Sequence, residues 1–152
     1  MLSEYLRLAR PFFVMLGIVT VGRWLQGTAF GVPYEKGTHV FSIVTLCLFA
    51  SLFSAVFLRA WLGWRLSRAT GFAMFMALAA QVVVLLSTVA SYLLGVSSYF
   101  SHPTALNQPE AVGLGQALGI RAGGLVVNVL LNGIAGALGW ALGSLLPARE
   151  RP

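Results

Sequence analysis

The chain has 152 residues, of which 58% are hydrophobic and only 9% are charged, and its formal net charge is +6. Soluble domains carry about 25% charged residues, so this composition excludes an ordinary soluble domain and indicates a single membrane domain. The basic residues stand at the ends of apolar runs and form no cluster with aromatic side chains, so the positive charge does not indicate a nucleic-acid partner.

The first predicted membrane span covers residues 11–30. It follows residues 1–10, whose apolar and charged residues are spaced as in a short interfacial helix. No small-residue cleavage pattern follows the apolar run, so we expect an uncleaved span and not a signal peptide. Arg23 lies in this span beside Trp24, and we expect its side chain to reach the membrane interface. The alternative is an inward-facing Arg23 that bonds to polar groups of other helices, which would indicate function.

The second and third predicted spans cover residues 39–58 and 71–94. The second is rich in Ser and Thr, whose hydroxyls can bond to helix carbonyls or to another helix. The connection at 59–70 is rich in Arg and Trp, which is typical of a loop at the headgroup layer. In the third span, Gln81 and Thr88 share one helix face. Gln81 is near the middle of its span, so we expect it to face other helices and not lipid.

Residues 95–121 form the long polar stretch of the chain, which we predict to be an outer loop between the third and fourth spans. A loop of this length without structure of its own is often functional. Asn107 can cap a short helix that begins near Pro109, with Glu110 in its first turn. The alternative is a segment that lies on the membrane surface.

The fourth predicted span, residues 122–146, carries no charge. Small and amide side chains recur on one of its faces at helical spacing. In lipid, small residues permit close approach of helices and polar groups bond across them. The face can therefore pack within the chain or against another protein, and its two Asn can satisfy neighbours or line a polar cavity. These residues are Gly124, Asn128, Asn132, Gly136, Gly139 and Gly143.

The distribution of basic residues predicts the orientation. Seven of them fall on one side of the four predicted spans and three on the other, so the positive-inside rule places both termini in the cytoplasm. The seven are Arg7, Arg10, Arg59, Arg65, Arg68, Arg149 and Arg151, and the three are Arg23, Lys36 and Arg121. The basic residues are almost all Arg, which is common in GC-rich bacterial genomes, so we expect a bacterial cytoplasmic membrane.

The sequence contains no recognised catalytic or nucleotide-binding motif. It has no Asp, and its single Cys47 can form neither an internal disulfide nor a thiolate metal site. The only candidate metal ligands are His39, His102, Glu35 and Glu110, and their spacing does not single out a metal or a haem site. We therefore expect no cofactor and no enzymatic activity.

The sequence leaves two main functional hypotheses. The first is a non-enzymatic subunit or assembly protein of a membrane complex, because the chain is small and its last span has a smooth face for packing. The second is a small oligomeric transporter or ligand-binding protein, because Gln81, Thr88, Asn128 and Asn132 predict a polar stripe with Arg23 at its outer end. A third, a redox protein or enzyme that uses His39 and His102, has the least support.

Overall fold

The computed structural model describes residues 2–29 and 41–146 of the chain. All the regular secondary structure in these two ranges is helical, and there is no strand. The elements, in order, are α1 (Leu2–Leu8), α2 (Arg10–Thr28), α3 (Ile43–Ala60), α4 (Leu66–Leu93), the 3-10 helix η1 (Pro103–Leu106) and α5 (Leu114–Ser144).

Three of these helices, α3, α4 and α5, are long and apolar enough to cross a membrane by themselves. Helices α1 and α2 pass the same test only as a pair, with a 60° bend between them. Pro11 lies in the first turn of α2, where a missing backbone N–H does no harm. The expected all-helical membrane class is therefore confirmed, with three or four candidate spans in the described residues.

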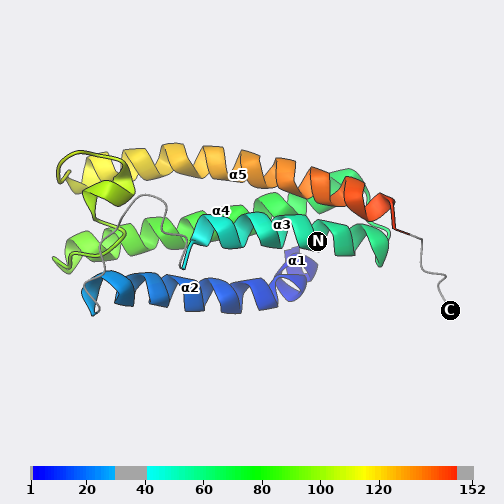
Figure 1. Ribbon diagram of the computed structural model, residues 1–152, viewed down its shortest axis with the longest axis horizontal. Helices are drawn as coiled ribbons and strands as arrows, with labels where there is room; N and C mark the ends of the chain where they lie inside the picture. Colours follow the sequence, from blue (N-terminus) through cyan, green and yellow to red (C-terminus); the bar gives the residue numbers. More distant parts are fainter. Residues whose placement is uncertain (1, 30–40, 147–152) are drawn as a thin grey trace.

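The four long helices lie side by side along the long axis, and each runs opposite to the one before it (Figure 1). The turn at 61–65, helix α1 and the end of α5 lie at one end of the molecule, which we call the turn end. The connection at 94–113 lies at the other end, which we call the loop end. Helix α5 packs extensively on α3 and α4, whereas α2 touches α3 over a smaller area.

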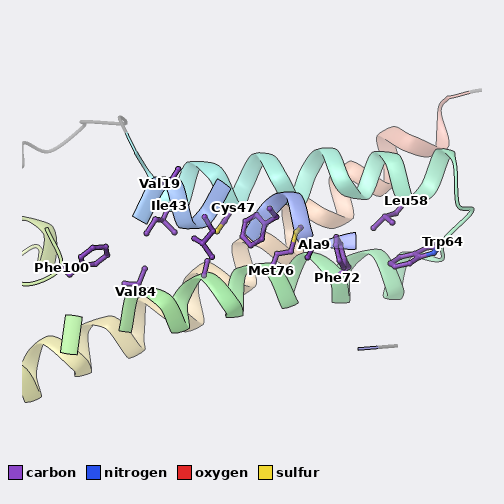
Figure 2. Close-up of a cluster of buried hydrophobic side chains, with 13 residues drawn as sticks. Ala9, Val19, Ile43, Cys47, Leu58, Trp64, Phe72, Met76, Val84 and Phe100 are labelled. Carbon is purple, nitrogen blue, oxygen red and sulfur yellow. The ribbon is translucent and has the colours of Figure 1, made fainter. Parts of the chain in front are cut away.

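Side chains from α2, α3 and α4 form the hydrophobic core (Figure 2). Val19, Cys47 and Met76 lie near its middle, and Phe100, from the connection at 94–113, extends it at the loop end. Phe100 is fully buried. The connection therefore belongs to the packed interior and is not a loop that extends away from the helices.

Helix α5 meets its neighbours through glycines. A Cβ atom at Gly136 would lie 2.6 Å from the Cβ of Ala73 on α4, and one at Gly139 would lie 2.2 Å from the backbone oxygen of Leu52 on α3. A Cβ atom at Gly143 would lie 2.7 Å from the backbone oxygen of Val56 on α3. Only a glycine permits backbones to come this close. The small face of α5 is therefore occupied by helices of the same chain.

Aromatic and polar contacts hold α1 at the turn end. The Tyr5 hydroxyl donates to the backbone oxygen of Arg68 over 3.0 Å, and Glu4 forms an ion pair with the Arg68 guanidinium. The Tyr5 ring stacks on Trp64, with centroids 5.8 Å apart. Trp140 on α5 donates its indole N–H to the Trp64 backbone oxygen over 2.8 Å. These contacts join α1, the turn at 61–65 and α5.

The helices have other bounds than the predicted spans. Helix α5 begins at Leu114 and not at 122, so the predicted loop 95–121 is helical over residues 114–121. Its glycines do not stop the helix, because their cost of about 1 kcal/mol each is smaller than what a continuous helix gains in packing and in lipid.

The helix expected near Pro109 does not form. The short helix in this region is η1, which lies earlier and ends at Asn107 in the left-handed conformation, with a φ of 56°. Asn tolerates this conformation better than most residues. Asn107 therefore ends a helix where we expected it to begin one. Helix α3 starts later than the predicted span, at Ile43, and helix α4 starts earlier, at Leu66.

Candidate functional site: a polar cavity at the loop end

The lengths of the helices leave a space at the loop end. Helix α3 has 18 residues and α4 has 28, and the short turn at 61–65 joins them. At a rise of 1.5 Å per residue, α4 extends about 15 Å beyond the start of α3. Ser42 caps the start of α3, where its side chain accepts a hydrogen bond from the Thr45 backbone N–H. The space above Ser42 is not filled by α3.

The connection at 94–113 covers this space. Its Leu106 is buried, like Phe100, and its Ser98 hydroxyl lies 2.6 Å from the Ser91 hydroxyl on α4. Tyr92, at the end of α4, donates to the Val112 backbone oxygen over 2.7 Å. These bonds fix both arms of the connection against α4. The connection therefore covers the space at the loop end.

A cavity of about 230 Å³ lies beneath the connection at 94–113. It is lined by the start of α3, by α4, by α5 and by the connection, and its walls combine apolar side chains with a few polar ones. The described lining residues are Ser42, Ile43, Val44, Gln81, Val84, Tyr99, Ala105, Leu106, Asn107, Ile120, Arg121, Gly124 and Asn128.

Three polar side chains of this lining come from helices. Gln81 on α4 is only 5% exposed, and its amide has no hydrogen-bond partner among the described residues. Asn128 on α5 donates to the Gly124 backbone oxygen over 2.8 Å. Arg121, one helical turn further out, donates through Nη2 to the Phe100 backbone oxygen over 3.3 Å, while its buried Nε has no partner. The cavity therefore holds polar groups with unused hydrogen-bonding capacity.

Arg23 lies against its own helix and the connection at 94–113. Its side chain is 6% exposed and donates to the Gln26 side-chain oxygen over 2.8 Å. The Arg23 guanidinium lies over the ring of Tyr99, 4.0 Å from its centroid, and Arg121 lies 5.8 Å from the same ring. Arg23 thus turns inward and supports Tyr99, which lines the cavity, because a guanidinium is attracted to the face of an aromatic ring.

The residues of the predicted polar stripe lie in different surroundings. Asn132 is fully buried below the cavity, where it accepts from the Ser51 hydroxyl and donates to the Asn128 backbone oxygen, each over 2.8 Å. Thr88 is buried and donates to the Val84 backbone oxygen of its own helix. Gly124 is not in a close helix contact, since a Cβ atom there would meet nothing within 4 Å. It lines the cavity.

The sequence interpretation missed the role of Arg121 because it placed this residue at the end of a loop. Arg121, Gly124 and Asn128 stand at positions i, i+3 and i+7, which share one helix face. This pattern becomes visible only when α5 is extended back to Leu114.

The candidate metal ligands do not form a site in the described part of the chain. His102 caps η1, where its Nδ1 accepts from the Thr104 backbone N–H over 3.3 Å, and Glu110 is exposed. His39 and Glu35 lie outside the described residues. No group of three His, Cys, Asp or Glu residues gathers within residues 2–29 and 41–146.

The cavity can hold a polar ligand through one cation, three amides and an apolar wall. This is the composition of a binding site, in which a few placed polar groups orient a ligand and apolar side chains surround the rest of it. Comparison of the chain with protein-family models, with curated proteins and with solved structures finds no match.

Proposed function

We propose that this protein is a four-span helical bundle of a bacterial cytoplasmic membrane, with both termini in the cytoplasm. The alternating directions of α2 to α5 support four crossings, with the bent α1–α2 pair as the first. The turn end holds the arginines at 59, 65 and 68, in and beside the turn at 61–65, together with helix α1, and the positive-inside rule assigns this end to the cytoplasm. The cavity then lies at the outer side of the membrane.

We further propose that the protein binds a ligand in this cavity and catalyses no reaction. The observation that carries this proposal is the pair of unsatisfied polar groups in the lining, the Gln81 amide and the Arg121 Nε. An unsatisfied polar group in a membrane interior costs several kcal/mol. A ligand that bonds to these groups would remove that cost.

The alternative function, a subunit or assembly protein of a membrane complex, has less specific support. It rested on the small face of α5 as a surface for another protein. Gly136, Gly139 and Gly143 are instead packed against α3 and α4 of the same chain.

Native mass spectrometry of the protein purified in mild detergent tests the ligand proposal. The wild type is expected to retain a small molecule or lipid, and Gly124→Leu is expected to lose it. A Cβ atom at Gly124 would meet nothing within 4 Å and the residue lines the cavity, so the variant should fold with its side chain in the cavity. Gly123→Leu is the matched control, because Gly123 is exposed, also has free space, and does not line the cavity.

Equal retention of the same molecules by the wild type and by Gly124→Leu would contradict a ligand in the cavity. The same spectra report the oligomeric state and any protein that remains bound. A second protein in fixed stoichiometry, together with an empty cavity, would favour the subunit function.

A further inference from the structure

We infer that the cavity recognises the anionic group of an amphiphile, a carboxylate or a phosphate, and that Arg121 is the residue that selects it. This inference rests on the proposed ligand-binding function and names the chemistry of its ligand. Three observations support it: the cation in the lining, the hydrogen-bond donors on α4 and α5, and the apolar side chains of the remaining wall.

The lining has a cation and no described counter-ion. The two acidic residues of the described chain are Glu4, which pairs with Arg68 at the turn end, and Glu110, which is exposed and forms no ion pair with Arg121. The neighbour of the Arg121 charge is instead the ring of Tyr99, which also faces Arg23. Arg121 is therefore the cation of the described lining, and its positive charge favours an anion.

The available donors suit an oxyanion. Arg121 bonds to the Phe100 backbone oxygen and to the Tyr99 side chain, which leaves some of its five N–H donors unused, and a guanidinium binds carboxylate and phosphate oxygens strongly. The Gln81 amide has a free N–H₂ group, and Asn128 Nδ2 has one proton beyond the one it donates to Gly124. These groups come from α4 and α5, so one anion between the two helices could accept from both.

The rest of the wall suits an apolar group. Ile43, Val44, Val84, Leu106 and Ile120 form most of the remaining lining. The cavity of about 230 Å³ is smaller than the roughly 300 Å³ at which sites for whole drug-sized ligands begin. It therefore holds the anionic group and the first part of an apolar chain. Val44 is 41% exposed on the outer surface of α3, so the chain can continue there into the lipid.

Competition between two lipids tests the inference. Purified protein is incubated with equal amounts of phosphatidylglycerol, which is anionic, and phosphatidylcholine, which is zwitterionic, with identical acyl chains. Native mass spectrometry then gives the ratio of the two bound lipids. The wild type should prefer phosphatidylglycerol, and Arg121→Gln should reduce the preference about tenfold or more, because a charge-assisted hydrogen bond is lost.

Two further variants separate selection from folding and from general charge attraction. Arg121→Lys keeps the charge and should retain part of the preference. Arg65→Gln removes an exposed cation at the turn end and should leave the preference unchanged. Inorganic phosphate in the same assay distinguishes the source of the anion. If it does not displace the lipid, the ligand is an anionic amphiphile as inferred. If it does, the ligand is a soluble anion, which overturns the amphiphile and keeps the recognition of an anion by Arg121.

The outcomes also separate this inference from the function on which it rests. Loss of both lipids in Gly124→Leu, with an unchanged ratio in Arg121→Gln, would overturn anion recognition and leave the cavity as a binding site. No effect of either variant would overturn both.

Discussion

The Ser51 hydroxyl on α3 donates a hydrogen bond to Asn132 Oδ1 on α5 over 2.8 Å, and both side chains are fully buried. The two residues are 81 positions apart in the chain, so this bond joins two helices that form separately. Bonds of this type in membrane proteins contribute about 1 kcal/mol to stability. The contact is therefore a stabilising one, placed directly below the cavity.

A double-mutant cycle with Ser51→Ala and Asn132→Ala should give a coupling free energy of about 1 kcal/mol. The measurement is unfolding of the purified protein by a denaturing detergent added to mild micelles. A parallel cycle with Ser51→Ala and Asn128→Ala serves as the control and should show no coupling, because the Asn128 side chain bonds to Gly124. A coupling of zero in the first cycle would show that the Ser51–Asn132 bond adds nothing to stability.

Gly139→Ala should lower the free energy of unfolding by about 1–3 kcal/mol, which is typical of overpacking. The added Cβ would lie 2.2 Å from the Leu52 backbone oxygen and 3.1 Å from the Ala55 Cβ, so the backbones of α3 and α5 must separate. Gly119→Ala is the matched control in the same helix, since it meets nothing within 4 Å. Thermal aggregation in detergent compares the two. Equal behaviour of the variants would mean that α5 does not pack closely on α3.

The orientation of the protein can be measured by cysteine labelling in a Cys47→Ala background. Glu110→Cys, on the exposed part of the connection at 94–113, should react with a membrane-impermeant maleimide added to intact cells. Ser67→Cys, exposed at the turn end, should react only after the membrane is permeabilised. The reverse pattern would invert the topology, and labelling of both positions from outside would show that α4 does not cross the membrane between them.

Helix α1 should depend on its aromatic contacts more than on its ion pair. Glu4→Gln removes a partly exposed ion pair with Arg68, which is worth at most about 1 kcal/mol. Tyr5→Leu removes a hydrogen bond and ring contacts with Trp64 and Phe72, each aromatic pair worth about 0.5–1.5 kcal/mol. Hydrogen exchange of the amides of residues 2–8 should therefore rise more in Tyr5→Leu. A larger rise in Glu4→Gln would assign the attachment of α1 to the ion pair.

The sequence by itself determined the class of the protein and the small face of its last helix. Long uncharged runs can satisfy their backbone groups in lipid only as helices, so composition and run length are sufficient to predict the helices. The spacing of Gly136, Gly139 and Gly143 likewise follows from helical periodicity alone. That these glycines meet α3 and α4, and not another protein, is information that only the packing supplies.

The tertiary structure decided the cavity, because it depends on how far each helix extends along its neighbours. Helix α3 starts at Ile43, well inside the loop end, and the connection at 94–113 folds back over the gap. Gln81 and Asn128 line that gap, whereas Asn132, one turn from Asn128, meets Ser51 instead. Periodicity predicts which helix face each amide lies on. Whether the amide then lines a cavity or contacts another helix depends on which neighbouring element reaches it. Arg121 would be a loop residue if α5 began at 122. Because α5 begins at Leu114, Arg121 lies on the helix and lines the cavity.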